Sequence, residues 1–148
     1  RELLDRIAAA GVVVARVTLH VGTGTFKPVR AEDVEDHVME PEAYEIPNAT
    51  LQAIDRATRV ISVGTTSCRT LEAWARTGKS AGATNLFIHP PFEFKVVDAL
   101  LTNFHLPKST LLMLVSAFAG RERTLEAYAE AVKERYRFFS YGDASLWI

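Results

Sequence analysis

The stretch from Phe94 to Gly120 constrains the fold more than any other part of the chain. It consists of two apolar runs that meet near Pro107, and the second run opens with Lys108-Ser109-Thr110. Proline interrupts regular structure and serine caps helices, so the two runs are predicted to be separate buried elements. The junction also carries four polar side chains, namely Asp98, Asn103, His105 and Lys108. Because polar groups beside a core must find partners, we interpret this junction as the centre of a site.

The composition is that of a folded globular chain. The 148 residues suffice for a hydrophobic core, and we predict a single domain over residues 1–148. Hydrophobic residues make up 48% and charged residues 24%, which argues against disorder. The formal net charge of −1 gives no general attraction to nucleic acid, so a polyanionic partner would need a local patch or residues outside this chain. No apolar run is long enough to span a membrane, and a single cysteine, Cys68, fits a reducing cytoplasm.

Helical and extended patterns alternate along the chain. Apolar residues recur every three or four positions in the segments predicted to be helices, which are residues 2–10, 48–58, 68–76, 111–119 and 124–136. Short β-branched or alternating segments are predicted to be extended, and these are residues 12–21, 42–46, 59–63, 85–89 and 138–148. This alternation predicts an α/β fold with a mixed β-sheet flanked by helices.

A glycine-rich segment, Gly22-Thr23-Gly24-Thr25, follows the first extended segment. Such a segment lets backbone amides approach an anion or a cofactor, but it also serves as a simple tight turn. The third glycine of a dinucleotide-binding fingerprint is missing, and no P-loop ending follows. His20 lies on the polar face of the preceding segment, where it is either structural or delivered to a ligand.

A second junction, Gly64-Thr65-Thr66-Ser67, places three hydroxyls at the start of a predicted helix. Free amides and the positive end of the helix dipole favour a carboxylate or phosphate at such a position. Capping accounts for one hydroxyl, so the motif predicts either a simple cap or an anion site. Arg69, one turn into the helix, could support the same anion.

Other patterns are less informative. Glu35-Asp36-His37 reads most simply as a solvated loop, and the histidines lack metal-ligand spacing, so no metal is assigned. No Gly-x-Ser-x-Gly elbow supports nucleophilic hydrolysis. Four phenylalanines are predicted either to pack in the core or to provide a stacking surface for a purine, and they are Phe87, Phe92, Phe94 and Phe104.

Several of these motifs together resemble one family, in order along the chain. The matching segments are residues 17–29, 35–37, 63–72, 94–112 and 136–143, and the block at 94–112 is the most specific. The family is the S-adenosylmethionine:tRNA ribosyltransferase-isomerase of queuosine biosynthesis. The resemblance covers essentially the whole chain but only the C-terminal portion of the family, which implies a fragment of a larger multi-domain enzyme. Cys68 and His89 stand where the family leads us to expect other residues.

The resemblance implies a reaction and its partners. The ribosyl group of S-adenosylmethionine would be transferred and isomerised onto 7-aminomethyl-7-deazaguanine at the tRNA wobble position, giving epoxyqueuosine and releasing adenine and methionine. S-adenosylmethionine would be a substrate, so no cofactor is expected, and the full-length enzyme is expected to be a cytoplasmic monomer without a membrane partner. Three alternatives stay open: a non-catalytic fragment that binds donor or tRNA, a generic enzyme acting on a phosphorylated metabolite, and a piece that mainly self-associates.

The implied chemistry assigns roles to the candidate residues. A base must remove a proton beside the sulfonium, and an acid or hydrogen bond should help adenine leave. His20 or Asp98 is the candidate base, and His105 is a second candidate for proton transfer. The threonine and serine hydroxyls with Arg69 would hold the methionine carboxylate or a tRNA phosphate, the glycines would allow close approach to the donor, and Lys108 would meet phosphate. The predicted substrate-binding residues are Gly22, Thr23, Gly24, Thr65, Thr66, Ser67, Arg69, Asn103 and Lys108.

Overall fold

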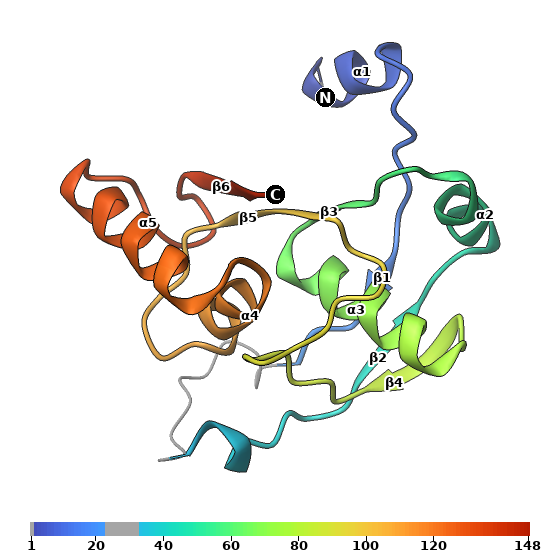
Figure 1. Ribbon diagram of the computed structural model, residues 1–148. Helices are drawn as coiled ribbons and strands as arrows, with labels where there is room; N and C mark the ends of the chain where they lie inside the picture. Colours follow the sequence, from blue (N-terminus) through green and yellow to red (C-terminus); the bar gives the residue numbers. More distant parts are fainter. Residues whose placement is uncertain (1, 23–32) are drawn as a thin grey trace.

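The strands form two small sheets with helices packed around them (Figure 1). The computed structural model describes residues 2–22 and 33–148. One sheet is antiparallel and contains, in spatial order, β1 (Thr18–Leu19), β2 (Glu42–Glu45) and β4 (Ala81–Thr84). In the other sheet β5 (Ala99–Asn103) pairs parallel with β3 (Ile61–Val63) and antiparallel with β6 (Ala144–Trp147). The predicted α/β class with flanking helices is confirmed, with the strands divided between two sheets.

The helices of the described residues are, in chain order, α1 (Glu2–Ala9), the 3-10 turn η2 (Val34–Asp36), α2 (Asn48–Arg56), α3 (Thr65–Thr77), α4 (Thr110–Ala119) and α5 (Arg121–Lys133). Ser109 caps α4 as predicted, since its Oγ accepts a hydrogen bond from the Leu112 amide at 3.1 Å. Gly120, at a φ of 86°, separates α4 from α5 in a conformation that side chains rarely adopt. None of these helices combines the length and apolar character needed to cross a bilayer.

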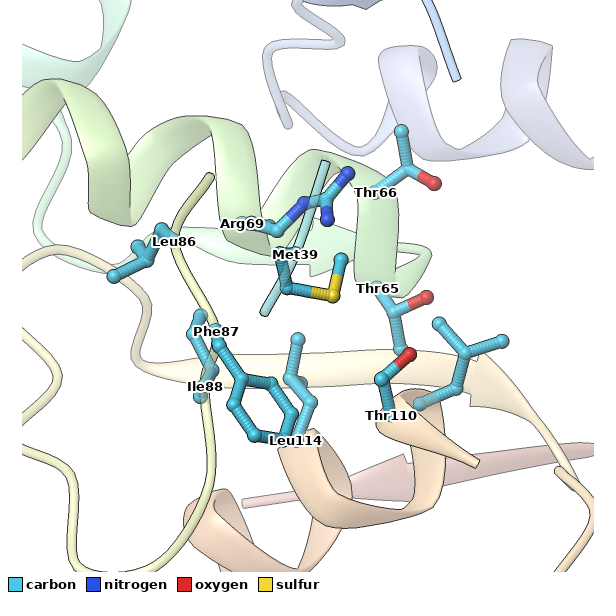
Figure 2. A pocket seen from close by; sticks show the side chains of 10 residues that line it. Met39, Thr65, Thr66, Arg69, Leu86, Phe87, Ile88, Thr110 and Leu114 are labelled. Atoms are coloured by element: carbon cyan, nitrogen blue, oxygen red, sulfur yellow. The ribbon is translucent and has the colours of Figure 1, made fainter. Parts of the chain in front are cut away.

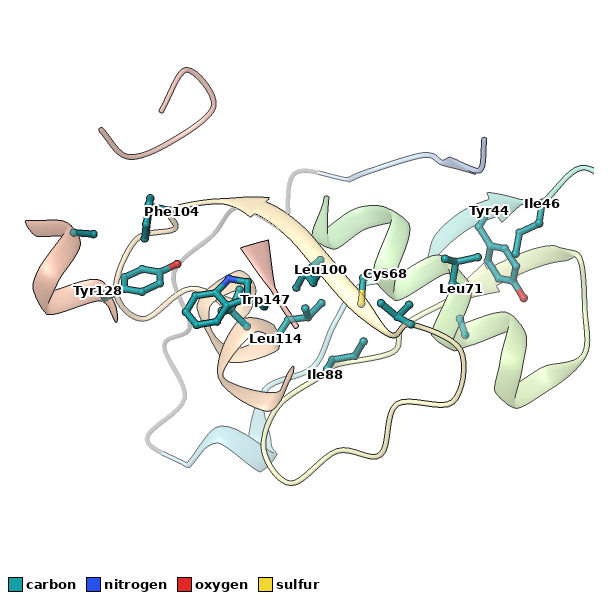
Figure 3. Packing of buried hydrophobic residues seen from close by; sticks show 14 residues of the cluster. Tyr44, Ile46, Cys68, Leu71, Ile88, Leu100, Phe104, Leu114, Tyr128 and Trp147 are labelled. Carbon is teal, nitrogen blue, oxygen red and sulfur yellow. The ribbon is translucent and has the colours of Figure 1, made fainter. Parts of the chain in front are cut away.

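The hydrophobic core joins the mixed sheet to α3, α4 and α5 (Figure 3). Leu100, on β5, is fully buried, and the neighbouring strands bury Ser62 and Trp147 in register with it. From the helices, Cys68 and Val115 are also fully buried. This packing holds the first turns of α3 and α4 against the same sheet.

One predicted strand is much longer than the observed strand and another is not formed, and both differences arise from strand pairing. Residues 12–21 were expected to be extended throughout, but only Thr18 and Leu19 pair with β2, and Val13 is 73% exposed. Residues 85–89 form no strand, because β2 pairs instead with β4 just before them, and the Leu86 amide donates to Thr84 Oγ1 at 3.1 Å as the chain turns. The β-strand propensity of a segment does not determine which neighbouring strand it pairs with.

Candidate functional site

The carboxyl ends of β3 and β5 meet at one edge of the mixed sheet. The two strands are parallel, and the Gly64 amide donates to the Leu101 carbonyl at 2.8 Å. The chain leaves β3 through Gly64 directly into α3, and it leaves β5 through a short loop into α4. The N-terminal turns of both helices therefore lie at the edge where α/β folds usually bind ligands.

A small pocket, partly open to solvent, lies between the N-terminal turns of α3 and α4 (Figure 2). Its walls combine hydroxyls, one guanidinium and apolar side chains, contributed by Met39, Thr65, Thr66, Arg69, Leu86, Phe87, Ile88, Thr110, Leu111 and Leu114. The fold thus brings together the predicted motif Gly64–Ser67 and the start of the second apolar run. The positive ends of two helix dipoles, with hydroxyl groups beside them, are suited to an anionic group.

A buried ion pair lies behind this pocket. Arg69 of α3 pairs with Glu42 of β2, and their side chains are only 6% and 3% exposed. The Oε1 of Glu42 also accepts a hydrogen bond from the Gly22 amide at 2.7 Å, so one carboxylate connects Gly22 to α3. Burial lowers the pKa of Arg69. Because Glu42 balances the charge of Arg69, the pocket is not strongly cationic.

Sequence reasoning missed Glu42, although one signal was present. Glu42 alternates with Tyr44 and Ile46, which are both buried, so a period of two places its carboxylate on the inward face of β2. An acidic residue at an inward position predicts a buried partner, but the sequence does not indicate that this partner is Arg69.

Only part of the first group of predicted site residues lines the pocket. Thr65 is buried and Thr66 half-buried, and both line it, whereas Ser67 is half-buried but is not one of its lining residues. His20 is exposed, and its amide donates to the Ala43 carbonyl at 2.8 Å. Thr23 and Gly24 lie outside the described residues.

The second group does not come together as expected. Asp98 stands just before β5 and accepts the Val60 amide at 2.7 Å, while His105 follows the opposite end of the strand. Five strand residues separate the two ends by roughly 16 Å, so the expectation that Asp98 lies at the junction is wrong. Asn103 and Lys108 lie at the correct end, but neither is among the residues that line the pocket. The catalytic and binding roles of all these residues stay predictions.

His105 is held in a local hydrogen-bond network. Its Nε2 lies 2.9 Å from Thr102 Oγ1, and its backbone amide donates to the Tyr128 hydroxyl at 3.0 Å. Burial lowers the pKa of His105 to about 4. The imidazole is therefore neutral at pH 7 and is a weaker base than an exposed histidine.

The four phenylalanines have different environments. Phe104 packs in the core against Tyr128, which confirms the core interpretation for this residue. Phe92 and Phe94 are half-buried, contact each other edge-on and pack against the core. Phe87 lines the pocket. Within residues 2–22 and 33–148, no group of three or more His, Cys, Asp or Glu side chains could hold a metal ion.

Comparisons with known proteins point to one family. A family model described as "Queuosine biosynthesis protein" matches residues 1–147. The chain is 56% identical to the S-adenosylmethionine:tRNA ribosyltransferase-isomerase of Thermotoga maritima, covering 98% of this chain and 45% of the relative. It is 58% identical to the protein of the same name from Rubrobacter xylanophilus, covering 98% of this chain and 43% of the relative.

A solved structure agrees with these similarities. The crystal structure of S-adenosylmethionine tRNA ribosyltransferase from Thermotoga maritima superposes with a TM-score of 0.82 at 49% sequence identity. The match covers 99% of this chain and 49% of that chain. The chain therefore spans less than half of the length of the relatives it matches.

Proposed function

The chain belongs to the queuosine biosynthesis family of S-adenosylmethionine:tRNA ribosyltransferase-isomerases, and from this premise we propose that it supplies part of such an active site. The reaction transfers and isomerises the ribosyl group of S-adenosylmethionine onto 7-aminomethyl-7-deazaguanine at the tRNA wobble position. The product is epoxyqueuosine, and adenine and methionine are released. S-adenosylmethionine is a substrate in this scheme, the second substrate is tRNA, and the cytoplasm is the proposed compartment.

One observation carries the proposal: the pocket between α3 and α4 joins two of the segments that resemble the family, residues 63–72 and 94–112. It places the hydroxyls of Thr65, Thr66 and Thr110 beside the first turns of two helices. The methionine end of the donor has a carboxylate and tRNA has phosphates, and either anion suits helix N-termini. Since Glu42 already balances Arg69, binding there depends on hydroxyls and amides more than on net charge.

The proton transfers are assigned less directly. His20 and Asp98 stay the candidate bases for the proton beside the sulfonium, and they lie in separate parts of the described chain. His105 enters the scheme best as a neutral hydrogen-bonding group, because its lowered pKa makes it a poor base at pH 7.

The proposal is tested by removing one pocket hydroxyl from the full-length protein. Thr66→Val keeps the shape of the side chain, and Thr58→Val, at an exposed position on another segment, is the matched control. Loss of a hydrogen bond to a charged group costs about 1.5–3 kcal/mol, so the affinity for S-adenosylmethionine or tRNA should fall about tenfold or more. The measurements are calorimetric affinities and adenine release, and a Thr66→Val protein that matches its control would refute the anion site.

A second candidate function is a non-catalytic binding fragment, which is favoured by the coverage of less than half of each relative. Calorimetry of the 148-residue chain with S-adenosylmethionine, beside an adenine-release assay, separates the two. Binding without release favours the fragment. Release of adenine in the presence of tRNA favours the enzyme.

A further inference from the structure

Three aromatic rings meet at the rim of the pocket. The ring centroids of Phe87 and His37 lie 4.9 Å apart with the planes at 66°, and those of Phe87 and His89 lie 4.8 Å apart at 40°. All three side chains are half-buried. Phe87 itself lines the pocket, as does Leu114 (Figure 2). The two imidazoles fix the orientation of a phenyl ring that faces the pocket.

The environment of Phe87 differs from that of the residues on either side of it. Among the described residues, Ile88 belongs to the core cluster and Leu86 packs against it, whereas Phe87 belongs to neither group. Phe87 is half-buried, so part of this residue is accessible at the pocket. Burial in the core therefore does not explain why a large flat side chain occupies this position.

We propose that Phe87, oriented by His37 and His89, stacks against a purine-type base bound in the pocket between α3 and α4. The inference deepens the proposed function and rests on it, because both substrates carry such a base: the adenine of S-adenosylmethionine, and the deazaguanine or a neighbouring base of tRNA. Aromatic side chains bind bases through their faces and tolerate any base. The hydroxyls on the opposite side of the pocket then bind the polar portion of the same ligand.

The test uses the full-length protein with Phe87→Leu, which keeps an apolar side chain but removes the ring, and Phe87→Trp, which restores one. Phe139, which is 61% exposed and does not line the pocket, provides the matched controls Phe139→Leu and Phe139→Trp. Affinities for S-adenosylmethionine and for tRNA are measured separately. Tryptophan emission of Phe87→Trp is followed as each ligand is added, against the emission of Phe139→Trp.

Because stacking contributes to binding, the affinity of Phe87→Leu for one of the two ligands should fall about fivefold or more. Phe87→Trp should bind the same ligand with normal affinity, and its tryptophan emission should be quenched when the ligand is added. A loss confined to S-adenosylmethionine identifies adenine as the base, and a loss confined to tRNA identifies a tRNA base. Unchanged affinities in Phe87→Leu, or equal losses in Phe139→Leu, overturn the stacking surface and leave the proposed function intact. Failure of the unsubstituted protein to bind either ligand overturns both.

Discussion

His105 illustrates how the fold changes the chemistry of a single side chain. In the sequence it is one of several polar residues near a predicted junction, and its imidazole is a natural candidate for proton transfer. In the fold, burial holds its pKa near 4, and Thr102 occupies its Nε2 at 2.9 Å. The same side chain that looked reactive in the sequence therefore has the features of a structural hydrogen-bonding group.

This environment predicts a pH dependence of stability. The pKa of His105 is about 4 in the folded state against an ordinary histidine pKa of 6.5, so the unfolded state binds more protons between these two pH values. Stability is unaffected above pH 6.5 and falls as the pH drops towards 4, by about 3 kcal/mol at most. Urea unfolding of the wild type and His105→Gln at several pH values measures the difference. The exposed His20→Asn serves as control, and a parallel decline in the wild type and His105→Gln would contradict the prediction.

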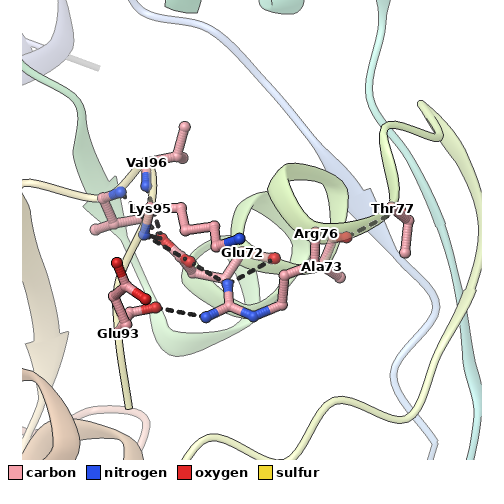
Figure 4. A network of polar contacts seen from close by, with 8 residues as sticks. Glu72, Ala73, Arg76, Thr77, Glu93, Lys95 and Val96 are labelled. Carbon is pink, nitrogen blue, oxygen red and sulfur yellow. Dashed lines mark hydrogen bonds and ion pairs between the residues drawn. The ribbon is translucent and has the colours of Figure 1, made fainter.

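At the scale of elements, one buried carboxylate on α3 holds the loop that follows Phe87 (Figure 4). Glu72, on α3, is completely buried and accepts the backbone amides of Lys95, Val96 and Val97 at 3.0–3.1 Å. Arg76 donates to the same carboxylate at 2.6 Å, and its guanidinium lies over a phenyl ring of the loop. The charge is thus neutralised while the loop is held against α3.

Removing the negative charge of Glu72 should lower the stability of the fold. Glu72→Gln keeps the size of the side chain but leaves Arg76 and the amides with weaker partners, so the free energy of unfolding should fall by about 3 kcal/mol. Glu126→Gln, at an exposed position on α5, is the matched control. Urea unfolding measures the loss, and hydrogen exchange of the amides of residues 95–97 reports the local opening. Equal stability of the two variants would show that the contacts of the Glu72 carboxylate make no net contribution to the free energy of unfolding.

Elements governed by neighbouring residues were predictable from the sequence, and those governed by distant partners were not. The Ser109 cap of α4 and the entry into α3 after Gly64 follow from local chemistry, and both were predicted. β2 pairs with β4 and not with residues 85–89, and this pairing depends on contacts between segments that are distant in the sequence. The ion pair of Glu42 with Arg69 joins different elements, so no local pattern reveals it.

At the scale of the whole molecule, the two faces of the mixed sheet differ. Leu100 and its neighbours in register face the helices and are buried, whereas the next row across β3, β5 and β6 is Val63, Leu101 and Leu146. Val63 is 66% exposed and Leu146 is 59% exposed. Alternation along each strand places this row on the opposite face. A sheet with an uncovered apolar face is characteristic of a surface that packs against other protein.

The uncovered face predicts that the 148-residue chain self-associates. Sedimentation velocity over a wide range of concentration should show oligomers whose population rises with concentration. Each large apolar side chain buried in such a contact contributes about 1.5–3 kcal/mol, so the double variant Val63→Lys/Leu146→Lys should weaken association about tenfold or more. Because both positions are exposed, its unfolding midpoint should change little. Val132→Lys, 64% exposed on α5, is the control. A monomer at every concentration, or equal dissociation in the control variant, would show that this face does not drive association.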